Sequence, residues 1–153
     1  MLPLVISTLA AFFAGVLAGE EFIVRYGVQP ALTTLGDLAA IQARQALVRR
    51  LRVVVPVLMV PTVLLAIATL ALDPTGPGCW FRVAGLVALV AFVLFSFLGT
   101  VPINIRVNDW DAEHPPADWK QTVARWQLID VFRSSAALLG FALLLVAVVL
   151  QAA

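Results

Sequence analysis

Charge is scarce in this chain. Asp, Glu, Lys and Arg make up 12% of its 153 residues, about half the usual share for a soluble domain. Hydrophobic residues make up 62%, and the net charge is only +1. A chain without a strongly basic surface is not expected to bind nucleic acid. This composition instead favours an integral membrane protein.

Residues of metal and redox chemistry are also scarce. A single cysteine, Cys79, excludes an internal disulfide, a CxxC relay and a cysteine-based zinc site. A single histidine, His114, excludes a bis-histidine haem and a multi-histidine metal centre. No glycine-rich phosphate loop and no G-x-S-x-G motif occurs. A carboxylate-bridged metal site stays open, with Glu20, Glu21 and Asp130 as its candidates, but we expect no cofactor.

Four apolar stretches dominate the sequence, each long enough to cross a bilayer, which takes about 20 residues per helix. We expect a single transmembrane domain over residues 1–153, with helices at about 4–26, 37–72, 80–101 and 119–150. The N-terminal stretch lacks the basic residues that open a signal peptide, so we interpret it as a retained helix. The predicted fold is an all-α four-helix bundle with up-down-up-down topology.

Local signals set the predicted helix boundaries. Gly27 and Pro30 predict the end of the first helix and Pro102 the end of the third, because proline interrupts backbone hydrogen bonding. Asp118 and Gln121 have the spacing of a capping box and predict the start of the last helix.

Most basic residues flank the two long polar connections, and only Arg82 falls on the other side. By the positive-inside rule both connections are cytoplasmic and both termini lie outside. The basic residues on the predicted cytoplasmic side are Arg25, Arg44, Arg49, Arg50, Arg52, Arg106, Lys120, Arg125 and Arg133.

Two adjacent carboxylates, Glu20 and Glu21, end the first apolar run. A carboxylate at the hydrocarbon edge is costly, so it usually faces the bundle and finds a partner. One interpretation is a general base, and the alternative is an ion pair of Glu21 with Arg25 or with an arginine of the last helix. Neighbouring residues diverge by about 100° on a helix, so only one of the two can face inward.

Polar residues also begin the second helix. Gln42, Gln45 and Arg49 share one face, which predicts a wet cavity or interhelical hydrogen bonds. The alternative is an amphipathic helix that lies on the membrane surface. Gln45 and Arg49 are therefore candidate substrate-binding residues. Arg44 lies elsewhere around the helix and is expected to reach lipid headgroups.

The second connection carries amide, charged and aromatic side chains. If the segment is extended, Asn104, Arg106 and Asn108 lie side by side. With Asp109, Trp110 and Asp111 they could bind a planar oxygenated ligand or tie the loop to the bundle.

The last helix adds a further set of candidates. Arg125 and Arg133 share a face, with Trp126 and Asp130 beside it. Arg133 is the deepest basic residue and needs an acidic partner, either for function or as a purely structural buried pair.

Several segments resemble the anthrone-oxygenase-like family of small four-helix membrane proteins, many of whose bacterial members carry only a domain-of-unknown-function label. The most specific are the Pro-Ile-Asn element and the stretch from Pro-Pro-x-Asp-Trp to Arg-Trp. The matching segments are GEEFIVRYGVQPAL (19–32), QALVRRLR (45–52), TVPINIR (100–106), WD (110–111), PPADW (115–119), RW (125–126) and FR (132–133).

The resemblance implies oxidation of a lipophilic aromatic molecule, anthrone-like or quinol-like, in a bacterial cytoplasmic membrane. An anthrone is a carbon acid whose enolate reacts with O₂ directly, so the protein supplies a base, oxyanion donors and a dry pocket. On this hypothesis Glu20 or Glu21 is the base and Trp110 and Trp126 stack the rings. The donors come from the set Asn104, Arg106, Arg125 and Arg133.

Two functions of other classes remain. One is a non-catalytic membrane subunit that binds a protein partner or lipid, and the other is a small carrier of an amphiphilic metabolite. A catalytic pocket predicts an enclosed cavity lined by Glu20 or Glu21 and Asn104, whereas a scaffold predicts those groups paired and no cavity. A carrier predicts a polar seam that reaches the opposite face. The expected partners are a lipophilic small molecule and membrane lipid, with a homo-oligomer left open.

Overall fold

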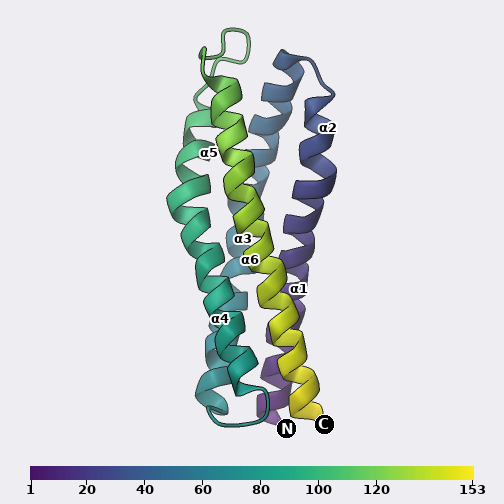
Figure 1. Cartoon of the computed structure of the whole chain (residues 1–153). Coiled ribbons are helices and arrows are strands. Elements are labelled where there is room, and N and C mark those ends of the chain that lie inside the picture. The colour runs from purple at the N-terminus through teal and green to yellow at the C-terminus, as the bar shows by residue number, and fades with distance from the viewer.

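The computed structural model describes residues 1–153 as four long helical segments packed side by side (Figure 1). Both termini lie at one end of the bundle, and the two polar connections lie at the other (Figure 1). The all-α, up-down-up-down prediction is therefore confirmed. The elements are α1 (Leu2–Ile23), η1 (Val24–Val28), α2 (Gln29–Thr33), α3 (Asp37–Leu72), α4 (Cys79–Leu94), η2 (Phe95–Thr100), α5 (Val101–Asn108) and α6 (Trp119–Ala152).

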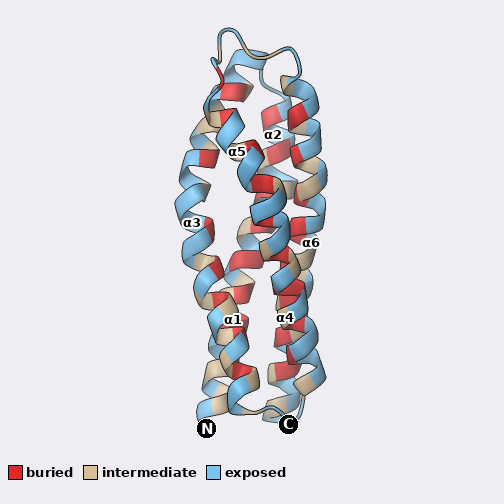
Figure 2. Cartoon of the chain, turned by 90° about the vertical axis from the view of Figure 1, so that its left-hand side faces the viewer, coloured by how far each residue is buried: buried red, intermediate tan, exposed pale blue.

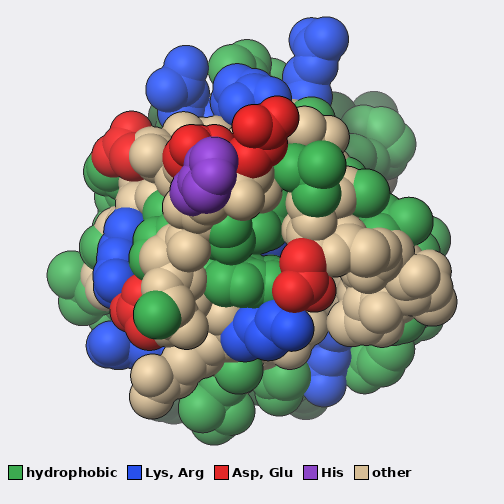
Figure 3. All heavy atoms as spheres, turned by 90° about the horizontal axis from the view of Figure 1, so that it is seen from above, with side chains coloured by type: hydrophobic (Ala, Val, Ile, Leu, Met, Phe, Trp, Pro, Cys, Tyr) green, Lys and Arg blue, Asp and Glu red, His purple; other side chains and the backbone are tan.

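Each segment is long and apolar enough to cross a membrane, which makes this a multi-pass membrane protein. The outward faces expose large hydrophobic side chains while buried residues follow the inner faces (Figure 2). The 36 residues of α3 correspond to about 54 Å, against about 30 Å of hydrocarbon. The excess lies at the connection end, where charged side chains gather around the rim (Figure 3).

The first helix does not end at Pro30 as predicted but continues to Thr33. A π-helical turn, η1, makes this continuation feasible: the N–H of Gln29 donates to the carbonyl of Val24, five residues back. Pro30 then stands at the start of α2, where a missing N–H costs little.

The third segment repeats this device, so the predicted end at Pro102 is also wrong. In η2 the N–H of Val101 donates to the carbonyl of Ser96, and Pro102 opens α5, which runs to Asn108. A glycine precedes the proline by three residues in both segments, as Gly27 and Gly99. The two segments thus share one local structure, a wide turn directly before a proline.

The last helix starts where predicted, with Asp118 at the N-cap, but the expected capping box is not formed. The Asp118 carboxylate instead accepts a hydrogen bond from Arg106 at 2.7 Å. This exposed ion pair fastens the end of α5 to the start of α6.

Helices α4 and α6 approach closely near the end that holds the termini. A Cβ at Gly140 would lie 3.1 Å from Leu89 Cγ and 3.4 Å from the Gly85 carbonyl oxygen. A Cβ at Gly85 would lie 3.1 Å from Leu144 and 3.4 Å from the Gly140 carbonyl oxygen. This reciprocal contact of small residues is how membrane helices pack tightly.

We predict that Gly140→Val destabilises the bundle by about 1–3 kcal/mol, because the added methyl groups overpack this contact. Thermal unfolding in mild detergent, followed by circular dichroism, measures the effect. Gly19→Val is the matched control, since a Cβ there meets nothing within 4 Å. Equal midpoints for the two variants would contradict the close approach.

Candidate functional site

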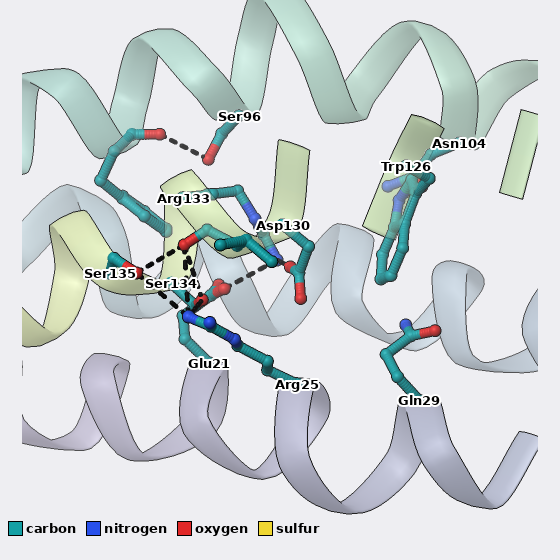
Figure 4. Close-up of polar contacts among 12 residues, drawn as sticks. Glu21, Arg25, Gln29, Ser96, Asn104, Trp126, Asp130, Arg133, Ser134 and Ser135 are labelled. Carbon is teal, nitrogen blue, oxygen red and sulfur yellow. Dashed lines mark hydrogen bonds and ion pairs between the residues drawn. The ribbon is translucent and has the colours of Figure 1, made fainter. Parts of the chain in front are cut away.

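A buried arginine joins α6 to α1. Arg133 Nη2 lies 2.8 Å from Glu21 Oε2 and 3.1 Å from Asp130 Oδ1, and all three side chains are at most 4% exposed (Figure 4). The guanidinium also lies 5.6 Å from the centre of the Phe92 ring. Of the two adjacent carboxylates, Glu21 is therefore the one that pairs with the buried arginine.

The other two charged side chains of this layer, Glu20 and Arg25, make no ion pair. Both carboxylate oxygens of Glu20 are buried without a hydrogen-bond partner. Arg25 does not pair with Glu21 but donates to the hydroxyls of Ser134 and Ser135 at 3.1 and 3.0 Å (Figure 4). Of the ion pairs considered for Glu21, the one with an arginine of the last helix is the one formed.

A second polar layer lies nearer the connections. Trp126 Nε1 donates to Asn104 Oδ1 at 2.9 Å. Arg44 lies over the Trp126 ring, 5.3 Å from its centre, and donates to Gln29 Oε1 at 3.2 Å. Trp126 thus links α5 to α3 through one ring, with its edge on an amide and its face on a guanidinium.

Both layers contribute to the wall of one cavity of about 380 Å³, which lies between α3 and the α4–η2–α5 segment with α6 behind it. Trp126 and Arg133, both in the wall, are seven residues apart, which is about 10 Å along a helix. The cavity is thus comparable in length with a tricyclic aromatic molecule, and its volume is in the range of small-molecule sites. Its polar lining residues are Arg44, Arg52, Ser96, Thr100, Asn104, Asn108, Asp109 and Arg133.

Asn104 and Arg133, both in the wall, hold N–H groups that make no hydrogen bond within the protein. The Trp126 N–H can only donate, so it fixes the Asn104 oxygen toward itself and leaves the Asn104 NH₂ without a partner. Arg133 makes both of its ion pairs through Nη2, so Nε and Nη1 make no hydrogen bond. The cavity is therefore a largely apolar space with uncommitted donors in its wall.

A family model described as anthrone oxygenase matches residues 45–143. The chain belongs to the anthrone oxygenase family. Comparison with curated proteins and comparison with solved structures both return no match. The family match covers α3 from Gln45 onward, α4, η2, α5 and the part of α6 that carries Trp126 and Arg133. Every residue that lines the cavity except Arg44 lies within it. The resemblance noted in the sequence is confirmed.

In this anthrone oxygenase family member, some predicted site residues lie outside the cavity. Arg106 pairs with Asp118 at the surface, and Arg49 and Arg125 are exposed. Gln45 donates to the backbone carbonyls of Val107 and Trp110 at 3.0 and 2.9 Å, and Trp110 is buried in a hydrophobic cluster. These last two tie the connection to the bundle.

The predicted row of Asn104, Arg106 and Asn108 is wrong because the segment is helical. Asn104 and Asn108, four residues apart, share the face that lines the cavity, while Arg106 points outward.

Sequence analysis missed Arg44, which was expected at the lipid headgroups but is only 6% exposed. A signal was present. The inner face of α3 runs through Val48, Val55 and Met59 at heptad-like spacing, and extending it toward the N-terminus reaches Arg44 and Ile41. The wall residues Ser96 and Thr100 had no such signal, because they depend on the π-helical turn η2.

The carboxylates divide into two groups around the cavity. Asp109 is the one in the wall, whereas Glu20, Glu21 and Asp130 are not. The structure contains no group of three or more His, Cys, Asp or Glu side chains placed to hold a metal ion. In the connection beyond α5, the backbone N–H of Glu113 and the His114 side chain hold the pKa of Asp111 below its usual value.

We predict that replacing Glu21 destabilises the protein whereas replacing Glu20 does not. Glu21→Gln removes one partner of a buried arginine and should destabilise by up to about 3 kcal/mol. Glu20→Gln replaces an unpartnered buried carboxylate by a neutral amide and should leave stability unchanged or raise it. Thermal midpoints in detergent test this pair, and a larger loss for Glu20→Gln would contradict the assignment of Glu21 as the inward partner.

Proposed function

We propose that the protein is a membrane-embedded oxygenase that acts on a lipophilic aromatic molecule, anthrone-like or quinol-like, without a cofactor. An anthrone-like substrate would react as a carbon acid, by the steps given below. The observation that carries the proposal is the cavity with uncommitted N–H donors from Asn104 and Arg133 and an otherwise largely apolar wall. A non-catalytic scaffold needs no such space. The polar lining residues all come from the half of the bundle nearer the connections, so no polar seam crosses the bundle as a carrier requires.

The depth of the site suits a substrate that dissolves in lipid. Glu21 lies 19 residues after the start of α1, about 29 Å along the axis and so near the edge of the hydrocarbon. An aromatic substrate and O₂ both dissolve well in hydrocarbon and could enter between the helices. From the positive-inside rule we propose that the connections lie in the cytoplasm of a bacterium and the termini outside.

The chemistry begins with loss of a proton from the ring carbon opposite the substrate carbonyl, which gives an enolate. The enolate carbon forms a bond to O₂, and protonation gives a hydroperoxide. Loss of water then leaves a second carbonyl, so that CH₂ and O₂ become C=O and H₂O. The protein needs to stabilise the enolate oxygen, accept the proton and keep bulk water out.

The geometry assigns these tasks to different side chains. We assign Asn104 Nδ2 and Arg133 Nη1 as donors to the oxyanion. A general base must come within hydrogen-bond reach of its proton, and Asp109 is the wall carboxylate, so we assign it this role in place of Glu20 or Glu21. Glu21 and Asp130 fix the position of Arg133 through their ion pairs.

The direct test is oxygen consumption with anthrone by the protein in lipid nanodiscs, with the anthraquinone product measured by chromatography and ¹⁸O₂ incorporation. Empty nanodiscs correct for spontaneous oxidation. We predict that Asn104→Asp keeps the acceptor for Trp126 but loses the free donor, and lowers kcat/KM about 100-fold. Arg125→Gln, at an exposed position, should stay within about twofold. No turnover above empty nanodiscs, or equal activity in the two variants, would overturn the proposal.

The base assignment has its own prediction. Asp109→Asn should lower kcat about 100-fold or more, since general-base catalysis contributes about that factor. Asp111→Asn, two residues further along and not in the cavity wall, is the matched control. An unchanged kcat in Asp109→Asn would contradict the assignment, because the substrate proton would then be accepted by another group.

A further inference from the structure

Three arginines of this protein are buried, and two of them are compensated by carboxylates. Arg82 is 1% exposed and lies 3.2 Å from Asp73. Arg133, also almost fully buried, pairs with Glu21 and Asp130. These two follow the rule that a buried charge needs an opposite charge.

Arg44 departs from that rule. It is 6% exposed, yet no carboxylate lies within 4.0 Å of its guanidinium. Its partners are a neutral amide, from Gln29, and the face of the Trp126 ring. An amide and an indole ring attract a cation more weakly than an anion does, so the protein leaves part of this buried charge uncompensated.

The uncompensated group lies in the wall of the cavity already described. Arg52 also lines that cavity without an ion pair, and Asp109 is the single carboxylate among the lining residues. Because Arg133 is already compensated, the charges of the wall without an ion pair are Arg44 and Arg52 against Asp109, which is an excess of one positive charge. The remaining surface of the wall is largely apolar. A cavity of this kind favours a ligand that is both hydrophobic and negatively charged.

We propose that Arg44 binds an anionic substituent, a carboxylate, on the aromatic substrate. The guanidinium lies over an aromatic face and has uncommitted N–H groups along its edge, an arrangement that suits bidentate binding of a carboxylate. Trp126, beneath Arg44, is about 10 Å along α6 from Arg133. A tricyclic acid could thus place its carboxylate at Arg44 while its carbonyl lies toward Arg133.

This inference rests on the proposed function only in taking the cavity as the substrate site. Binding is measured without turnover, so the two proposals can fail separately. A lipid phosphate is the other anion available in a membrane. We favour the carboxylate because Arg44 is enclosed beside an aromatic wall, whereas the exposed Arg49 and Arg50 are the ones free to meet headgroups.

The test compares anthraquinone-2-carboxylate with anthraquinone-2-carboxamide, which share a ring system and differ in charge. Binding to the protein in phosphatidylcholine nanodiscs is followed by quenching of tryptophan fluorescence and by calorimetry. We expect the carboxylate to bind about 10- to 100-fold more tightly, as for a charge-assisted bidentate contact. Arg44→Met should abolish that preference while retaining affinity for the carboxamide. Arg49→Met, on the exposed side of the same helix, should keep the preference.

Three outcomes would overturn the inference. The first is equal affinity of the two probes for the unaltered protein. The second is a preference that survives in Arg44→Met or, if that variant does not fold, in Arg44→Gln. The third is loss of the preference in the unaltered protein when phosphatidylglycerol replaces part of the phosphatidylcholine, which would identify a lipid headgroup as the anion at Arg44.

Discussion

The ion pairs of Arg133 are the interaction on which the arrangement of this bundle depends. A buried guanidinium at the hydrocarbon edge is stabilised by carboxylates that reach it, and Glu21 from α1 does so at 2.8 Å. This contact fixes the rotation of α1 relative to α6. It also directs the rest of the Arg133 side chain toward the cavity, where Nη1 remains free. The same buried arginine thus both holds α1 against α6 and directs a hydrogen-bond donor, Nη1, toward the cavity.

The π-helical turns are the second constraint, because they let two helices continue through prolines instead of ending at the membrane surface. Because the third segment continues through η2 into α5, residues 101–108 stay helical and Asn104 meets Trp126. Helix α5 places Asn104 and Asn108 along the cavity, and Asp109, which directly follows α5, also lines it. π-Helical turns recur at functional sites. They shift the side chains that follow them around the helix while the helix itself continues.

How much could be predicted from the sequence follows from these physical causes. The four spans, the topology and the need of Arg133 for an acid follow from hydrophobic length and from the cost of burying charge, and the structure agrees with each. The predicted helix ends at Pro30 and Pro102 were wrong. Proline usually ends a helix, but a π-helical turn before it depends on tertiary contacts that a local sequence pattern does not show. Arg44 was misplaced because arginine was assumed to seek water, although the spacing of Val48, Val55 and Met59 already indicated its face.

The free-energy cost of burying Arg44 and Arg133 is connected with how strongly each can bind an anion. Low polarity around Arg44 and Arg133 raises the free energy of their charges, and the same low polarity strengthens their attraction for an oxyanion in the cavity. At Arg133 two carboxylates offset the cost of burying the charge, and they also weaken its attraction for an oxyanion. At Arg44 the partners are an amide and an aromatic ring, so more of the attraction for an anion remains. The two ends of the cavity therefore differ in strength. A substrate with one permanent negative charge and one charge that develops during reaction matches this difference, since the permanent charge compensates Arg44 throughout. The developing charge then meets the weaker, pre-positioned donors of Arg133 and Asn104, where stabilisation in the transition state rather than in the bound ground state is what accelerates the reaction.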